Sequence, residues 1–155
     1  MMKPLRVYVD TSVVGGCMDP EYARDSRRIF TLAGEGRLVL LVSDIVLAEL
    51  TGAPPKVRDI LPGTPRSSVE FVEITGEIIS LRDAYIKAQV VGRGNLDDAA
   101  HVAAATIARA DAILSWNFRH IVRLDKIKEY NQVNLANGYG ILTIITPKEV
   151  NVDET

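Results

Sequence analysis

Short continuous runs of valine, isoleucine and leucine alternate along this chain with longer stretches of helical character. The apolar runs, which we expect to be strands, are Leu5–Val9, Arg37–Val42, Glu70–Ile74, Ala112–Ser115 and Ile141–Ile145. The stretches that we expect to be helices are Pro20–Ala33, Asp44–Leu50, Gly76–Val91, Leu96–Arg109 and Phe118–Tyr130. Continuous apolar runs indicate strands covered on both faces, and strands that alternate with helices connect by right-handed crossovers. The pattern predicts an α/β fold, a three-layer α/β/α sandwich with a mostly parallel sheet of four to five strands.

The length of 155 residues fits one domain, which we expect at 1–150 with a short polar tail at 151–155. The segment 52–68 holds four of the seven prolines and is expected to be an irregular excursion with room for one short helix. No apolar run approaches the roughly 18 to 20 residues of a membrane-spanning helix. Cys17 is the single cysteine, which excludes a disulfide framework within the chain. We therefore expect a cytoplasmic protein with no membrane association.

The net charge of −2 at pH 7 excludes a globally basic nucleic-acid binder. It leaves open an enzyme that holds a metal ion in an acidic pocket and contacts nucleic acid through local basic patches. Candidates for such patches are Arg24, Arg27, Arg28, Arg119, His120 and Arg123. The polar stretch Tyr130–Tyr139 could contact unpaired bases, whereas Trp116 is better assigned to the core or an interface.

An acid directly follows the first expected strand. Asp10 comes after Val9 and is followed by two hydroxyl residues, Thr11 and Ser12. In an open α/β sheet, ligands bind at the carboxyl ends of the strands, so a carboxylate here is placed where a metal or phosphate site would be built. Taken alone, a helix cap or a turn explains Asp10 equally well.

Two further acids stand near other expected strand ends. Glu49 interrupts the mostly apolar stretch Asp44–Leu50, although a solvated outer helix face explains it slightly better when it is taken alone. Asp98 lies on the first turn of the helix expected at Leu96–Arg109, on the same face as His101. We assign Asp98 to function and Asp97, about 100° away, to the helix dipole. His101 is expected to support the site by hydrogen bonding rather than as a ligand.

Geometry separates the two polar residues that flank the fourth expected strand. Asp111 precedes that strand and Asn117 follows it, so at about 3.3 Å per residue they lie at least ~13 Å apart. Only Asn117 can share the carboxyl end of the sheet with Asp10. Asn117 is also a suitable N-cap for the helix expected from Phe118, and it could serve both purposes.

These segments, taken in order, resemble those of the PIN-domain nucleases, a family that includes the VapC-type toxins of toxin–antitoxin pairs. The resemblance covers nearly the whole chain. Its segments are Val-Tyr-Val-Asp-Thr-Ser with Asp10, Val-Leu-Ala-Glu-Leu with Glu49, Asp-Asp-Ala-Ala-His-Val-Ala with Asp98, and Ile-Leu-Ser-Trp-Asn with Asn117. The family's fourth acidic position is often aspartate, and this chain has Asn117 there.

The resemblance implies a metal-dependent ribonuclease with Mg²⁺ or Mn²⁺ held by Asp10, Glu49 and Asp98. Three carboxylates without a cysteine ligand suit these hard cations better than Zn²⁺. Asn117 is the fourth site residue, and its missing charge makes a second metal ion harder to bind. Thr11 and Ser12 would support the site by hydrogen bonds to a carboxylate or a phosphate. RNA as substrate, an antitoxin protein as partner and a homodimer follow from the same resemblance.

Two alternatives remain at this point. The first is a catalytically weakened PIN-fold module that binds RNA or a protein partner without cleavage, which the Asn117 substitution motivates. The second is a phosphatase or phospho-receiver of similar architecture. The residues after Asp10 are Thr11 and Ser12, so the Asp-x-Asp pair of haloacid-dehalogenase-like phosphatases is missing, and no glycine-rich phosphate loop with lysine is present.

Overall fold

Five parallel strands form one sheet in the order β3-β2-β1-β4-β5 in the computed structural model, which describes residues 3–152. The strands are β1 (Leu5–Val9), β2 (Leu38–Ser43), β3 (Val69–Val72), β4 (Ala112–Leu114) and β5 (Ile144–Ile145). Each strand is joined to its neighbours by parallel pairing, for example Val7 with Leu40 of β2 and with Ala112 of β4. The expected parallel sheet is confirmed, with β1 at its centre.

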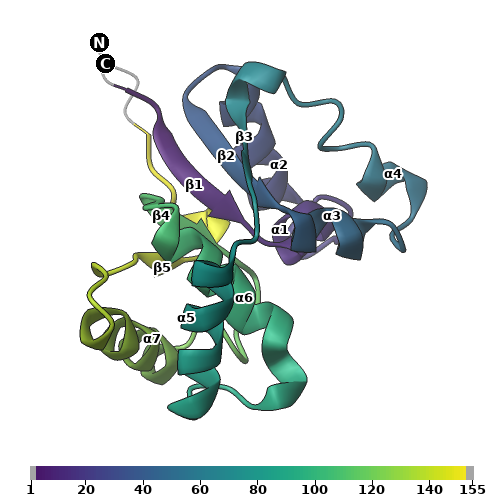
Figure 1. The fold of residues 1–155 in the computed structure, drawn as a ribbon. Helices are drawn as coiled ribbons and strands as arrows, with labels where there is room; N and C mark the ends of the chain where they lie inside the picture. Colours follow the sequence, from purple (N-terminus) through teal and green to yellow (C-terminus); the bar gives the residue numbers. More distant parts are fainter. Residues whose placement is uncertain (1–2, 153–155) are drawn as a thin grey trace.

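Helices cover both faces of this sheet (Figure 1). The α-helices are α1 (Thr11–Gly16), α2 (Ala23–Gly34), α3 (Asp44–Leu50), α4 (Pro55–Arg58), α5 (Gly76–Lys87), α6 (Leu96–Ile107) and α7 (Leu124–Ala136). Short 3₁₀ turns stand at η1 (Arg66–Ser68), η2 (Arg93–Asn95) and η3 (Pro147–Glu149). Helices α1 and α2 lie on one side of the sheet, and α5, α6 and α7 lie on the other. The expected three-layer α/β/α sandwich is therefore confirmed.

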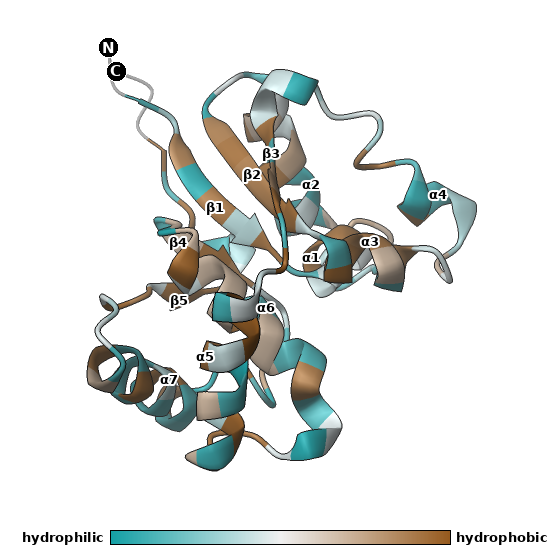
Figure 2. Ribbon diagram, in the orientation of Figure 1, coloured by the Kyte–Doolittle hydropathy of each residue, from teal (hydrophilic) through white to brown (hydrophobic). Residues whose placement is uncertain are grey.

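The core lies between the sheet and its two helix layers. Figure 2 shows β2 in the brown of apolar residues and β1 in brown with a teal band and a pale arrowhead, while the outer helices have mixed colours. Four of the six residues of α6 from Ala99 to Ala104 are alanines, and all six are buried. Such small side chains let α6 approach the sheet and α5 closely, which brings the first turn of α6 beside the strand ends.

Two helices differ from the sequence prediction. Helix α1 starts directly after Asp10, where no helix was expected, because Asp10 caps it by accepting a hydrogen bond from the backbone N–H of Val13. The helix expected from Phe118 begins only at Leu124. Residues 118–122 form a single turn closed on Asn117, and the extended backbone of Arg123 (φ −146°, ψ 134°) separates this turn from α7.

Helix α7 also ends at Ala136, six residues beyond its expected end at Tyr130, and the other boundaries agree with prediction to within a few residues. The proline-rich segment 52–68 contains α4 and η1 and is otherwise irregular, as expected. Of the predicted polar tail, residues 153–155 lie outside the described part of the chain. Among residues 3–152, no helix combines the length and apolar character that crossing a membrane requires.

Candidate active site

The strand order reverses direction between β1 and β4, and this point positions the candidate site. From β1 the chain adds β2 and β3 on one side, and it then crosses to add β4 and β5 on the other. Helices on opposite faces separate at such a switch point and leave a crevice at the carboxyl ends of the two central strands. Asp10 follows β1 there, and Ser115 and Asn117 follow β4.

Asp10 is buried at this crevice, and its carboxylate accepts three hydrogen bonds. Its Oδ1 accepts from Ser12 Oγ at 2.6 Å and from the backbone N–H of Val13 at 3.3 Å. Its Oδ2 accepts from Ser115 Oγ at 2.5 Å. Burial raises the pKa of Asp10, and the electrostatic effect of the nearby His101 together with these hydrogen bonds opposes that rise. Asp10 is thus a helix cap, as one interpretation of the sequence had it, and its carboxylate lies at the strand ends, as the other required.

Glu49 is held by two donors from different elements. Its Oε1 accepts from Thr11 Oγ1 at 2.8 Å and from His101 Nε2 at 2.9 Å. The hydrogen bond from His101 is the main reason that the pKa of Glu49 is lowered. Because a carboxylate can only accept, the Nε2 of His101 carries the proton in this pair. His101 is 3% exposed and supports Glu49, in the position expected for it.

The other ring nitrogen of His101 continues this chain of hydrogen bonds into the core. In the neutral ring, Nδ1 accepts from the buried Tyr8 hydroxyl at 2.7 Å. The Tyr8 hydroxyl also contacts Ser43 Oγ at 2.7 Å. Ser43 is the N-cap residue of α3 but makes no side-chain cap bond, because its hydroxyl turns to Tyr8 instead. A buried series, Ser43–Tyr8–His101, therefore fixes the carboxylate of Glu49 from behind.

Asn117 presents its amide nitrogen, not its oxygen, to the acids. Its Oδ1 accepts from the backbone N–H groups of Arg119 at 3.1 Å and His120 at 2.9 Å. These two donors fix the orientation of the amide, so Nδ2 donates to Asp98 Oδ1 at 3.1 Å. The cap interpretation of Asn117 is right, although the cap closes a turn rather than starting a helix. Toward Asp98, Asn117 supplies a neutral hydrogen-bond donor.

The negative charges of Asp10 and Glu49 act on Asp98. Burial raises the pKa of Asp98, and the charges on Asp10 and Glu49 raise it further, against the effect of the two histidines. Among residues 3–152, no lysine or arginine forms an ion pair with any of the three carboxylates. A partly buried acid cluster without a cation is unfavourable for the chain alone and favourable for a bound cation.

The donor set fits a hard divalent ion in its chemistry. All three groups are carboxylates, which suit Mg²⁺ or Mn²⁺. As the side chains are placed, no three His, Cys, Asp or Glu residues of the described chain are arranged to hold a metal ion. Both oxygens of Asp10 face Ser12 and Ser115, and Oε1 of Glu49 faces Thr11 and His101. Ligation would exchange some of these hydrogen bonds for contacts with the ion.

The remaining acids lie where the sequence argument placed them. Asp97 is exposed beside Asp98 on the first turn of α6. Asp111 accepts from the backbone N–H of Arg6 at 2.8 Å, at the opposite end of the sheet from Asp10. Ser115 holds Asp10, and Tyr8 and Ser43 hold His101; none of the three was predicted as a site residue. Only Ser115 has a sequence signal, a hydroxyl two residues before Asn117.

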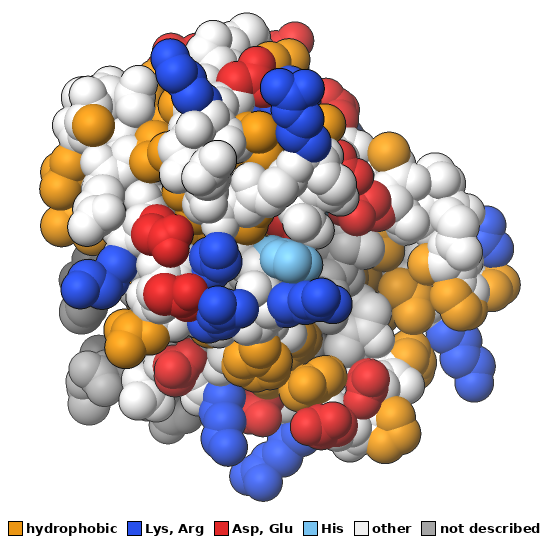
Figure 3. Space-filling view, turned by 90° about the horizontal axis from the view of Figure 1, so that it is seen from below, with side chains coloured by type: hydrophobic (Ala, Val, Ile, Leu, Met, Phe, Trp, Pro, Cys, Tyr) orange, Lys and Arg blue, Asp and Glu red, His pale blue; other side chains and the backbone are white. Residues whose placement is uncertain are grey.

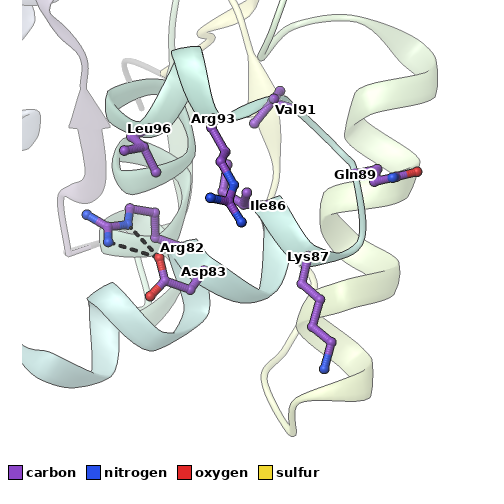
Figure 4. Close-up of a pocket in the computed structure, with 9 residues that line it drawn as sticks. Arg82, Asp83, Ile86, Lys87, Gln89, Val91, Arg93 and Leu96 are labelled. Carbon is purple, nitrogen blue, oxygen red and sulfur yellow. Dashed lines mark hydrogen bonds and ion pairs between the residues drawn. The ribbon is translucent and has the colours of Figure 1, made fainter.

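Of the three site acids, Asp98 lines a hollow that also has basic side chains. One cavity of about 320 Å³ is lined by Arg93, Gly94, Asn95, Leu96, Asp97 and Asp98. A neighbouring cavity of about 950 Å³ shares Arg93 and Leu96 with it and also includes Arg82 and Lys87. Arg82 is paired with Asp83 at 2.9 Å, whereas Lys87 points away from that pair (Figure 4). A negatively charged polymer could follow this hollow from the end of α5 to Asp98.

Solved structures of known proteins share this fold. No family model and no curated protein sequence matches the chain. The chain is similar to VapBC2 from Rickettsia felis bound to a DNA fragment from its promoter, with a TM-score of 0.54 and 15% identity over 74% of this chain and 90% of that one. It is also similar to VapC20 from Mycobacterium tuberculosis, a sarcin-ricin loop cleaving toxin, with a TM-score of 0.56 and 14% identity over 88% of this chain and 98% of that one. At these identities the likeness establishes the fold: the expected PIN-like architecture is confirmed, and it is that of VapC toxins.

Proposed function

We propose that this chain is a metal-dependent ribonuclease and the toxin component of a toxin–antitoxin pair. The observation that carries the proposal is that hydrogen bonds hold Asp10, Glu49 and Asp98 beside the carboxyl ends of β1 and β4, where none of the three forms an ion pair with a lysine or arginine of the described residues. The fold shared with VapBC2 and with VapC20, a sarcin-ricin loop cleaving toxin, supports the same activity. The three carboxylates would hold Mg²⁺ or Mn²⁺, and the neutral Asn117 favours one ion rather than two.

Each residue has a defined task in this reaction. When bound, the ion supplies an activated water and neutralises charge on the phosphoryl oxygens. Asp10 and Asp98 would hold it, with Asp10 oriented by Ser12 and Ser115. Because Oε1 of Glu49 is held by Thr11 and His101, the second oxygen, Oε2, is free to orient the attacking water or to take its proton. Asn117 keeps Asp98 in place through its amide.

Substrate and partner binding have separate candidate surfaces. On the face seen from below, lysine and arginine side chains gather beside a histidine (Figure 3), and Arg93 and Lys87 line the hollow that reaches Asp98. These cations would bind the phosphates of RNA. An apolar hollow of about 410 Å³ adjoins Thr11 and includes Met18 and Leu50. It could receive an apolar helix of an antitoxin. A homodimer remains an expectation from the family resemblance.

The deciding experiment is cleavage of a panel of structured and unstructured RNAs with Mg²⁺, Mn²⁺ or EDTA. We expect metal-dependent cleavage by the wild type and its loss in both Asp10→Asn and Asp98→Asn. Asp97→Asn is the matched control, since it removes a neighbouring exposed carboxylate from the same helix turn, and it should retain activity. Cleavage that persists in Asp10→Asn and Asp98→Asn would place the chemistry elsewhere and reject the proposal.

One observation favours a second candidate function. Asn117 donates a hydrogen bond to Asp98 where the resembled family often has an acid, so the site has less negative charge with which to bind a metal ion. A PIN-fold module that binds RNA or a protein partner without cleavage would have such a site. RNA binding by the folded protein with no cleavage in either metal would favour this candidate over the ribonuclease.

A further inference from the structure

Three aromatic side chains gather on the α1–α2 side of the candidate site. Tyr22 and Trp116 stack with ring centroids 4.3 Å apart and an interplanar angle of 20°. Phe118 lies against both, with centroids 6.5 Å from Tyr22 and 6.3 Å from Trp116, and its ring is tilted to each. Because Trp116 and Phe118 flank Asn117 in the chain, this aromatic cluster is joined directly to the site.

The inner part of the cluster is rigid. The Trp116 indole N–H donates to Ser26 Oγ at 2.8 Å, and its backbone N–H donates to Ser12 Oγ at 2.8 Å. Helix α1 approaches so closely that a Cβ on Gly16 would lie 2.5 Å from Ser26 Oγ and 2.8 Å from Trp116 Nε1. Trp116 is 8% exposed, which confirms its core assignment. The pair Tyr22–Trp116 thus forms a fixed support for the third ring.

The outer ring, by contrast, is open to solvent. Phe118 is 49% exposed, on the first residue of the turn that Asn117 caps. That cap fixes the backbone of the turn, so the ring is held at the rim of the site and is not carried on a loose loop. Core packing does not account for a half-exposed phenylalanine one residue from an active-site amide. An exposed aromatic face there offers a stacking surface to a ligand.

We propose that Phe118, backed by Tyr22 and Trp116, stacks an unpaired base of RNA next to the phosphodiester bond at the acids. This inference rests on the proposed function for its substrate class. Base–aromatic stacking tolerates any sequence and requires an unstacked base, so the site would select single-stranded RNA or a loop. The exposed Arg119 follows Phe118 in the chain and supplies a cation for an adjacent phosphate.

Trp116 is the only tryptophan of the chain, and it lies in contact with the proposed site. The experiment uses Asp10→Asn protein in Mg²⁺, so that the RNA is not cut, and titrates it with short single-stranded RNA of mixed sequence. The same strand without its bases and the RNA duplex serve as probes that lack an unpaired base. We expect the single strand to change Trp116 emission and to bind more tightly than either of the other probes.

Variants of Phe118 separate stacking from charge. Phe118→Ala should weaken binding of the single strand by roughly tenfold, leave binding of the base-free strand unchanged, and lose the emission change. Phe118→Tyr should restore both. Phe71→Ala is the matched control, since Phe71 is 54% exposed but stands on the edge strand β3.

Two results would overturn the inference. One is an unchanged affinity of Phe118→Ala for single-stranded RNA, which would leave the ring to a protein partner. The other is an equal loss for the strands with and without bases, which would mean a general disturbance of the site. Failure of the ribonuclease proposal is distinguishable, because wild-type protein that never cleaves RNA in any metal could still bind single strands through Phe118.

Discussion

At the residue scale, Asn117 decides the charge of the site. Asp98 accepts its amide N–H, and both backbone donors of the turn hold its oxygen. Asn117→Asp keeps the cap but replaces the donor with a second carboxylate facing Asp98. We expect the metal-free protein to lose about 1.5 to 3 kcal/mol in its free energy of unfolding, which is typical for a hydrogen bond to a charged group.

The same change should strengthen metal binding. With four acids at the site, we expect the Kd for Mn²⁺, measured by calorimetry, to fall by about tenfold or more. Asn117→Ala is the control, since it removes cap and donor without adding charge and should destabilise the protein without tightening Mn²⁺ binding. Unchanged Mn²⁺ affinity in Asn117→Asp would show that this position does not face a metal ion.

A second prediction at the residue scale concerns Tyr8, whose buried hydroxyl contacts both Ser43 and His101. Tyr8→Phe removes the hydroxyl that lies between Ser43 and His101 and leaves both buried groups without that partner. We expect a loss of about 1 to 3 kcal/mol in the free energy of unfolding, measured by urea denaturation. Ser43→Ala should cost less, because Tyr8 can still donate to His101. Equal losses in the two variants would contradict the proposed order of the hydrogen bonds.

At the element scale, the packing of α1 against α2 depends on one glycine. Gly16→Ala would drive a Cβ into Ser26 Oγ and the Trp116 ring. We expect overpacking to destabilise the fold by about 1 to 3 kcal/mol and to shift Trp116 emission. Gly15→Ala is the matched control, because nothing lies within 4 Å of its added Cβ. That change should be neutral or stabilise the helix by about 0.5 to 1 kcal/mol.

Some elements could be predicted from the sequence with their observed bounds, and others could not. Strand β1 and helix α3 were predicted with their observed bounds, because apolar runs and helical periodicity are local properties. Helix α1 and the turn at 118–122 that precedes α7 were not predicted, since in each the side chain of Asp10 or Asn117 accepts hydrogen bonds from backbone N–H groups and so competes with propensity.

In the candidate site, the main residues could be predicted from the sequence, whereas their hydrogen-bond partners could not. Asp10, Asp98 and Asn117 could be proposed because the order of strands and helices brings strand ends together, and Glu49 joined them through the resemblance to the PIN-domain nucleases. The partners that orient them come from residues far apart in sequence. Ser115 reaches Asp10 across 105 positions, and His101 reaches Tyr8 across 93. No local pattern contains such pairs, so the hydrogen-bond network of the site had to be seen in the structure.

At the scale of the whole molecule, the acid site links folding to pH and to metal ions. The pKa values of Asp10 and Asp98 are raised in the folded chain, so between about pH 4 and those raised values the native state binds more protons than the unfolded state. The metal-free protein should therefore become more stable as pH falls from 7 into that window. Glu49, whose pKa is lowered, contributes in the opposite sense and only at still lower pH.

A bound divalent ion should reverse this dependence, because it stabilises the ionised carboxylates. At a free Mn²⁺ concentration of about 100 times Kd, we expect about 2.7 kcal/mol of added stability at pH 7, or a rise in Tm of roughly 5 to 10 °C. The gain in stability should vanish as the carboxylates protonate.

In Asp98→Asn the rise in Tm on adding Mn²⁺ should be lost. The metal-free variant should be at least as stable as the metal-free wild type at pH 7, since the repulsion between the acids is relieved. Thermal unfolding at several pH values, with Mn²⁺ or EDTA, measures all of these terms. A metal-free wild type that is more stable than Asp98→Asn at pH 7 would mean that Asp98 serves the fold rather than a bound ion.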